Sequence, residues 1–505
     1  MEPSTIRELR LRLGESQTRF GARFNVSQIT VGYWENGRSQ PTRQRLGELM
    51  TLASSAAPKT PTVMPFRPIQ YLGSKQRLAQ TIADVIDEAA PGTSRVGDLF
   101  AGSSVVSAVL GARRPVTAVD VQAYSTALSH AVLLGRADEF SKLTSDTWLP
   151  QCAEIQEYLE KLLAPLLAFE CAAEEHAVKG DAERLNQLIE FGSIAVHEQR
   201  PLAGIPAELA KLLSTAAKSL GKSRLSSSQL TATRYFAGPY FSYKQAIALD
   251  AICASTNALG TGTERASQAV LLSTASEIVN TVGKQFAQPM KLMKANGRIP
   301  PLLLQRALRD RGLSAVDVFR EWAARWQIHA LGENHAHHIM RGDVTEFVRS
   351  DKECRAYYAD PPYTIDHYSR FYHVLETLAL RDSPHLDEMK KRGKMAVLRG
   401  IYRAGRYQSP FCIQREAPNA FDQLIGATRS RKAPLVMSYS PFDEEEGHRP
   451  RLLALSELIA IAKKHYPRVS VMEINEHSHR RLNTKSANTS IRSDAERLII
   501  CEVAN

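Results

Sequence analysis

The chain has 505 residues, too many for one ordinary domain, and carries a formal net charge of +11. No apolar run approaches the ~18 residues of a transmembrane helix, and the first residues lack the apolar stretch of a secretory signal. The six cysteines are scattered without a Cys-x-x-Cys pair, which argues against a zinc site or a disulfide framework and is typical of a reducing cytoplasm. The positive charge favours a polyanionic partner, most often nucleic acid.

Residues 1–54 predict a small domain of short helices. Ser16 and Ser27 are natural N-caps of two helices, and Gly37 is well suited to follow the end of the second. Apolar residues at helical spacing predict a buried stripe of Phe20, Val26, Val31 and Trp34. The opposite, exposed face would present Gln28, Ile29 and Tyr33.

This pattern resembles the Cro/repressor type of helix-turn-helix, whose second helix enters the major groove of double-stranded DNA by its N-terminal end. A glutamine can bond adenine through N6 and N7. A small module used for dimerisation is the alternative. Residues 55–66 are small and Pro-rich and predict a linker. The resemblance implies DNA contacts from Gln17, Gln28, Ile29, Tyr33 and Asn36.

Two segments after the linker predict an α/β fold with a ligand at the ends of its strands. Residues 94–106 predict a strand, a Gly/Ser turn and a helix, and such a turn lets a ligand approach the backbone at a helix N-terminus. Residues 115–120 predict a second strand, and its terminal Asp120 is placed to accept hydrogen bonds from a ribose diol. The turn is not Gly-x-Gly-x-x-Gly, which disfavours NAD and FAD. Either segment alone is also compatible with plain strand-to-helix packing.

A later apolar run, which predicts a buried strand, ends in Asp360-Pro361-Pro362-Tyr363. Two consecutive prolines fix φ near −65° and remove two backbone donors, so their carbonyls are stiff acceptors. Asp360 adds an acceptor and Tyr363 a flat ring, which together make a cradle for a planar group bearing an NH₂. The alternative is a Pro-Pro turn after a strand.

Together these segments resemble the D12 class (Dam-like, alpha-group) of adenine-N6 DNA methyltransferases. The family's blocks occur in its order, as Tyr71-Leu72-Gly73-Ser74-Lys75, Asp98-Leu99-Phe100-Ala101-Gly102-Ser103, Asp120, a long insert, Gly342-Asp343 and Asp360-Pro361-Pro362-Tyr363. The resemblance implies a Rossmann-like S-adenosylmethionine-dependent core from residues 67–144 and 332–505, with a mostly helical target-recognition domain inserted at 145–331. It implies no metal, and a cofactor site made of Tyr71, Gly73, Lys75, Asp98, Phe100, Ala101, Gly102, Ser103, Asp120, Asp343 and Val344.

Further DNA contacts are expected from three other segments. Residues 234–245 interleave aromatic and basic side chains, which suits stacking on bases, although a packed aromatic turn is as good an explanation. Residues 389–406 form a basic run after the catalytic block, and residues 477–481 are a basic loop between two late strands. The candidate residues are Arg234, Tyr240, Tyr243, Lys244, Arg403, Arg406 and His479.

The resemblance implies methyl transfer from S-adenosylmethionine to N6 of an adenine flipped out of duplex DNA. Asp360 and the Pro361 carbonyl would each accept one N6–H bond, within the catalytic block of Asp360, Pro361, Pro362 and Tyr363. Tyr363 would stack on the base. Cytosine-N4 methylation is an alternative, although that family form more often begins with Ser. RNA as the substrate, a repressor on an inactive methyltransferase scaffold, and a methyltransferase that also represses transcription are further alternatives. We expect a cytoplasmic, nucleoid-associated protein of a bacterium or phage, with a homodimer and a cognate restriction endonuclease as open partners.

Overall fold

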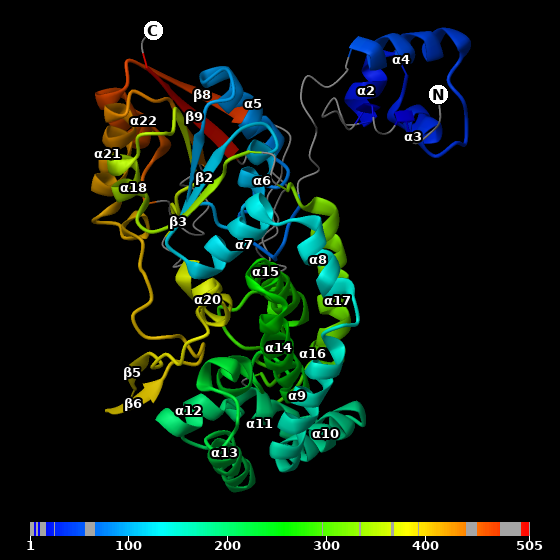
Figure 1. Cartoon of the computed structure of the whole chain (residues 1–505), viewed down its shortest axis with the longest axis vertical. Helices are drawn as coiled ribbons and strands as arrows, with labels where there is room; N and C mark the ends of the chain where they lie inside the picture. The colour runs from blue at the N-terminus through cyan, green and yellow to red at the C-terminus, as the bar shows by residue number, and fades with distance from the viewer. Residues whose placement is uncertain are drawn as a thin grey trace. The chain divides into compact units, whose positions relative to one another are not determined.

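The computed structural model describes residues 5–6, 9–10, 17–24, 26–55, 66–294, 296–332, 335–364, 368–391, 393–440, 452–474 and 496–503. The chain forms two compact units, Met1–Met64 and Pro65–Asn505. Both are shown in Figure 1.

The first unit contains the helices α2 (Gln17–Arg23), α3 (Gln28–Glu35) and α4 (Arg43–Ser55). The Ser27 hydroxyl caps α3 by accepting from the Thr30 N–H at 3.2 Å, and Gly37 follows the helix with φ +70°, so both predictions are confirmed. Its core includes Phe20, Phe24, Val31, Trp34 and Leu49, while Val26 is only partly buried. Gln28, Ile29 and Tyr33 are exposed as predicted, and Ser16 lies outside the described residues.

The second unit is built on a seven-stranded sheet of order β3-β2-β1-β4-β7-β9-β8. Neighbouring strands from β3 to β7 pair in parallel, and β9 runs antiparallel to both β7 and β8. Along the chain, β1, β2 and β3 are added toward one edge of the sheet, and β4 and β7 are then added toward the other edge. The order therefore reverses between β1 and β4, where α/β sheets bind their ligands. The strands are β1 (Val96–Leu99), β2 (Val116–Asp120), β3 (His338–Arg341), β4 (Ala356–Ala359), β7 (Leu435–Tyr439), β8 (Arg468–Ile474) and β9 (Glu496–Glu502).

Helices cover both faces of this sheet. Figure 1 shows α5 (Ala79–Ala89), α6 (Val105–Gly111) and α7 (Ala123–Leu134) on one side, and α18 (Val344–Ser350), α21 (Ala417–Ser430) and α22 (Leu455–His465) on the other. Tyr358 belongs to the core on the first side and Tyr357 to the core on the second, because successive strand residues point to opposite faces. Burial on both faces explains the apolar runs from which these strands were predicted.

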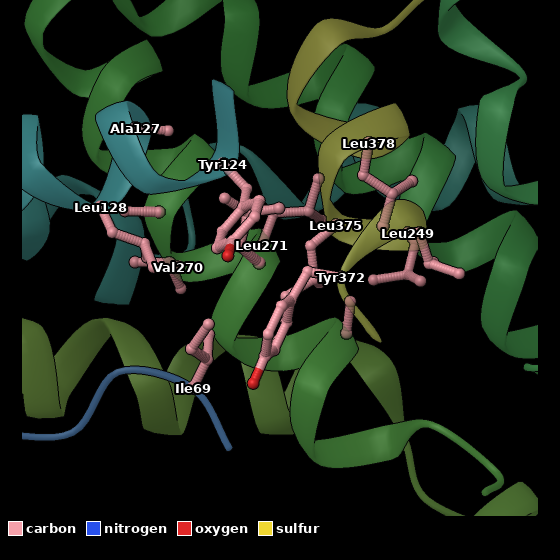
Figure 2. Packing of buried hydrophobic residues seen from close by; sticks show 14 of the residues in the cluster. Ile69, Tyr124, Ala127, Leu128, Leu249, Val270, Leu271, Tyr372, Leu375 and Leu378 are labelled. Carbon is pink, nitrogen blue, oxygen red and sulfur yellow. The ribbon is translucent and has the colours of Figure 1, made fainter. Parts of the chain in front are cut away.

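The insert is helical and shares its largest core cluster with the rest of the unit, besides a smaller cluster of its own that includes Leu185 and Leu292. In Figure 2, Val270 and Leu271 of α15 (Thr261–Ile278) lie with Leu128 of α7 and Leu375 of α20 (His373–Leu380) in the shared cluster. The insert is therefore packed onto the part of the chain that carries the sheet. The helix α8 (Ala137–Thr144) precedes the insert. The other helices of the insert are α9 (Leu149–Leu162), α10 (Ala164–Val178), α11 (Glu183–Phe191), α12 (Ile194–Gln199), α13 (Ala207–Leu220), a π-helical turn (Ala232–Phe236), α14 (Tyr243–Thr256), α16 (Pro301–Arg311) and α17 (Ala315–His329).

The segment after the catalytic tetrapeptide holds α19 (Tyr368–Phe371), α20, and an antiparallel hairpin of β5 (Glu388–Lys391) and β6 (Lys394–Val397). This hairpin lies apart from the main sheet (Figure 1). Among the described residues, no helix combines the length and apolar character needed to cross a membrane. Short 3-10 turns occur at Ser227–Gln229, Asn257–Leu259, Val282–Lys284 and Pro410–Cys412.

Candidate active site and cofactor pocket

The loop between β1 and α6 has an unusual backbone. Phe100, Gly102 and Ser104 have φ of +66°, +54° and +59°, the left-handed region that side chains disfavour. A Cβ on Gly102 would lie 2.6 Å from the hydroxyl oxygen of Tyr71. Only glycine therefore allows the loop and the Tyr71 ring to approach this closely.

Asp120, the last residue of β2, ties two loops together. Its carboxylate accepts from the Gly102 N–H through one oxygen and from the Gln122 N–H through the other, both at 2.9 Å. Burial raises the pKa of Asp120, and these N–H donors oppose that shift. The carboxylate is thus fixed at the carboxyl edge of the sheet, beside the glycine loop.

Two adjoining pockets open at this edge. The larger one is lined by Tyr71, Phe100, Asp120, Asp343, Val344, Asp360, Pro361 and Pro362, among others. The smaller one shares Tyr71, Phe100 and Asp360, and adds Gly73, Lys75, Asp98, Ala101, Gly102 and Ser103. The structure therefore brings together every residue predicted to hold the cofactor, together with three of the four residues predicted to be catalytic.

Asp98 lies buried at the floor of the smaller pocket. Burial raises its pKa to about 7, although the Ser107 hydroxyl donates to its carboxylate and opposes the shift. A cationic group entering this pocket would favour the ionised carboxylate.

Asp343 caps the N-terminus of α18 by accepting from the N–H groups of Thr345 and Glu346, at 2.8 and 3.0 Å. The hydroxyl of Tyr407 lies 3.5 Å from its second oxygen. Burial and the neighbouring Asp343 raise the pKa of Tyr407 to about 12, so this phenol stays protonated. Tyr407 was not predicted from the sequence.

Asp360 follows β4 directly, and its N–H lies 3.5 Å from the Leu99 carbonyl. Its carboxylate makes an ion pair with Lys75 at 2.9 Å, and it is 21% exposed whereas Lys75 is buried. Tyr363 does not line either pocket and packs against Tyr439, with ring centroids 5.0 Å apart. The tetrapeptide therefore presents its carboxylate and prolines to the pockets.

An aromatic wall beside the glycine loop was also missed. Tyr71 stacks on Tyr372, with centroids 4.9 Å apart, and the Tyr372 hydroxyl accepts from the Leu72 N–H at 2.6 Å. Tyr368 continues this stack and lines the larger pocket. The spacing of Tyr368 and Tyr372, four residues apart just after the tetrapeptide, is the signal that could have identified one helical face.

Two predicted DNA contacts in the insert are wrong. Tyr240 and Tyr243 are fully buried, and their hydroxyls donate to carbonyls inside the protein, so they cannot stack on bases. The packed aromatic turn is the correct interpretation of this segment. Arg234 makes an ion pair with Glu198 at 2.5 Å, and Lys244 is exposed.

Arg403 and Arg406, which are predicted to contact phosphates, make ion pairs within the protein, and their DNA contacts stay a prediction. Arg403 pairs with Asp382 and Arg406 with Asp387, each at 2.6 Å, and Arg406 lies over the Tyr402 ring. These charges are compensated within the protein, where they brace the base of the β5–β6 hairpin. His479 lies outside the described residues.

In the first unit, the exposed face of α3 carries Gln28, Ile29 and Tyr33, and Asn36 is exposed at its end. The Gln17 amide donates to the Glu35 carboxylate at 2.8 Å, which directs it into the module. Gln17 therefore connects two helices of the module, and its DNA contact stays a prediction.

The reversed strand order, the acid at the end of β2 and the pockets at the switch point define a Rossmann-like α/β fold of the nucleotide-binding type. Residues 71–196 match the family model of the D12 class N6 adenine-specific DNA methyltransferases, and residues 6–52 match a helix-turn-helix family. The two matches show the predicted architecture, a D12-class DNA adenine methyltransferase region behind an N-terminal helix-turn-helix. The methyltransferase match ends before Asp360. No curated protein and no solved structure matches the chain.

Proposed function

We propose that the protein transfers a methyl group from S-adenosylmethionine to N6 of an adenine flipped out of double-stranded DNA. The observation that carries this proposal is the position of Asp360 and Pro361 at two pockets that contain all the predicted cofactor residues. The family match supports adenine as the acceptor and DNA as the substrate.

The residues of both pockets fit this methyl donor. The larger pocket offers Asp120 and Asp343 as acceptors for a ribose diol and an adenine amine, between aromatic and apolar walls. The smaller pocket is lined by Gly102, where a Cβ would collide with Tyr71, and Asp98 offers its carboxylate to the ammonium end of an amino acid. When bound, S-adenosylmethionine supplies a methyl group on a sulfonium sulfur, which keeps the electron pair of the broken carbon–sulfur bond.

The protein's own contribution is to place the acceptor amine. Asp360 and the Pro361 carbonyl each accept one N6–H bond, which aims the nitrogen lone pair into the pocket. Such orientation can lower a barrier by several kcal/mol. A base inside the duplex cannot reach this cradle, so it must first leave the stack. Tyr363 would stack on that base, with Tyr439 packed against the tyrosine ring. The amine loses its extra proton to solvent after the transfer.

The test is to sequence modified bases in DNA from cells that express the protein. We expect N6-methyladenine at one motif, and none with Asp360→Ala, which should still bind S-adenosylmethionine within about threefold because it retains the other pocket residues. The exposed Asp317 on α17 provides a matched control, and Asp317→Ala should methylate normally. N4-methylcytosine in place of N6-methyladenine, or full activity of Asp360→Ala, would refute the assignment.

We further propose that the helix-turn-helix makes a second, separate DNA contact. Two large side chains on α3, Ile29 and Tyr33, are 66% and 44% exposed, which is the typical face of a recognition helix. Deleting residues 1–55 distinguishes two roles. Lost methylation would show that the module targets the enzyme, whereas normal methylation with lost promoter binding would show transcriptional regulation.

A further inference from the structure

Glu496 reaches the active site because of the direction of its strand. Strand β9 is antiparallel to β7, so its first residues, and not its last, lie at the carboxyl edge of the parallel strands. Arg497 pairs with Tyr439, the last residue of β7, which packs against Tyr363. A residue from the end of the chain is thereby brought beside the catalytic tetrapeptide.

Glu496 is 1% exposed, and its carboxylate lies 3.3 Å from the Lys75 ammonium. The same ammonium lies 2.9 Å from Asp360 and 3.4 Å from the Gly73 carbonyl. The Glu496 oxygen lies within ion-pair distance of this ammonium but makes no hydrogen bond to it, so their attraction is electrostatic. Lys75 is therefore shared between two carboxylates, one buried and one facing the pockets.

This sharing has an electrostatic consequence. Burial alone would lower the pKa of Lys75, but Asp360 and Glu496, with smaller contributions from Tyr363 and Tyr358, raise it well above its ordinary value. The ammonium thus stays charged at any working pH. With one carboxylate it would be drawn wholly to Asp360 and would neutralise the acceptor that the adenine amine needs. With two, the ammonium is divided between Asp360 and Glu496.

We infer that Glu496 is a positioning residue for methyl transfer, which holds Lys75 so that the ammonium fixes Asp360 without using up its capacity to accept the N6–H bond. This role rests on the proposed function. Glu496 is then the third charged residue of this cluster, beside Lys75 and Asp360.

The first test is Glu496→Gln, which keeps the shape of the side chain and removes its charge. We expect kcat to fall on the order of 10- to 100-fold, because a small displacement of the acceptor is costly. The KM values for DNA and the Kd for S-adenosylmethionine, measured by calorimetry, should stay within about threefold. Glu473→Gln is the matched control, because Glu473 pairs with Arg497 at 3.0 Å on the neighbouring strand and is exposed. Its kcat should equal that of the wild-type protein.

A second test needs no turnover. Lys75→Met leaves two buried or half-buried carboxylates without their cation and should lower the Tm. Adding Glu496→Gln removes one of these charges, so the double variant should regain part of that Tm. In the Lys75→Met background, Glu496→Gln should lower kcat little further, because Glu496 acts through the lysine.

The inference is overturned if Glu496→Gln keeps full kcat while the wild-type protein methylates adenine. It is overturned equally if the double variant melts below Lys75→Met, or if the two losses in kcat multiply. Absence of methylation by the wild-type protein would instead refute the proposed function itself.

Discussion

Replacing Gly102 by alanine tests whether the close approach of the loop and Tyr71 builds the cofactor pocket. The backbone at Gly102 has φ +54°, and the new Cβ would lie 2.6 Å from the Tyr71 hydroxyl oxygen and 2.9 Å from the ring carbon that bears it. Both contacts are far inside van der Waals distance, so the ring must move. The Gly102 N–H must also keep its bond to Asp120.

Two costs can be estimated for Gly102→Ala. Placing an alanine in the left-handed region costs roughly 1–2 kcal/mol. Moving Tyr71 off Tyr372 forfeits part of an aromatic contact, which contributes roughly 0.5–1.5 kcal/mol. We therefore expect a loss of about 2–3 kcal/mol in the free energy of unfolding. Because Tyr71 lines both pockets, the affinity for S-adenosylmethionine should fall at least about tenfold, or 1.4 kcal/mol.

The assay is titration calorimetry of S-adenosylmethionine combined with thermal melting. Gly297→Ala is the matched control, because Gly297 has φ +76° and open space where its Cβ would lie. That variant should lose stability through backbone strain alone and keep its affinity. Equal affinity in the two variants would refute the reasoning that Gly102 shapes the pocket through Tyr71.

Two further predictions concern the buried acid and the hairpin. The pKa of Asp98 is raised by burial to about 7, above its unfolded value, so its contribution to stability is present at low pH and is lost as pH rises from about 4 to 7, by at most about 4 kcal/mol. Asp98→Asn should remove this pH dependence, so that its Tm falls less between pH 5 and 7 than the Tm of the wild-type protein. An unchanged dependence of Tm on pH would contradict the prediction. Arg406→Ala should expose the β5–β6 hairpin to limited proteolysis, because it loses Asp387 and Tyr402, while the salt dependence of DNA binding stays constant. A salt slope reduced by about 1 would show that Arg406 contacts a phosphate after all.

The features that were predicted correctly are local in sequence. The strands β1, β2 and β4 are short and mostly buried, and a candidate site residue lies at or next to the end of each: Asp98 within β1, Asp120 at the end of β2 and Asp360 just after β4. The roles of Ser27 and Gly37 at the two ends of α3 are also local, because each depends only on the short helix between them.

The errors have a common physical origin, because a side chain's partners can lie outside the segment that suggests its role. The acids that pair with Arg403 and Arg406 of the basic run 389–406 are Asp382 and Asp387, which lie just before it. Aromatic residues are equally suited to cores and to stacking surfaces, so composition could not separate the buried Tyr240 from an exposed platform.

The contacts between the insert and the site could not be predicted for the same reason, because they depend on packing between segments that lie far apart in the sequence. Ser276, near the end of α15, accepts from the Gln70 N–H at 3.0 Å, and Tyr372 accepts from the next-but-one N–H at Leu72. The segment that carries Tyr71 and Lys75 is thus held between the insert and α20. Two backbone hydrogen bonds and the Lys75–Asp360 ion pair therefore form a continuous set of contacts from α15 and α20 to Asp360.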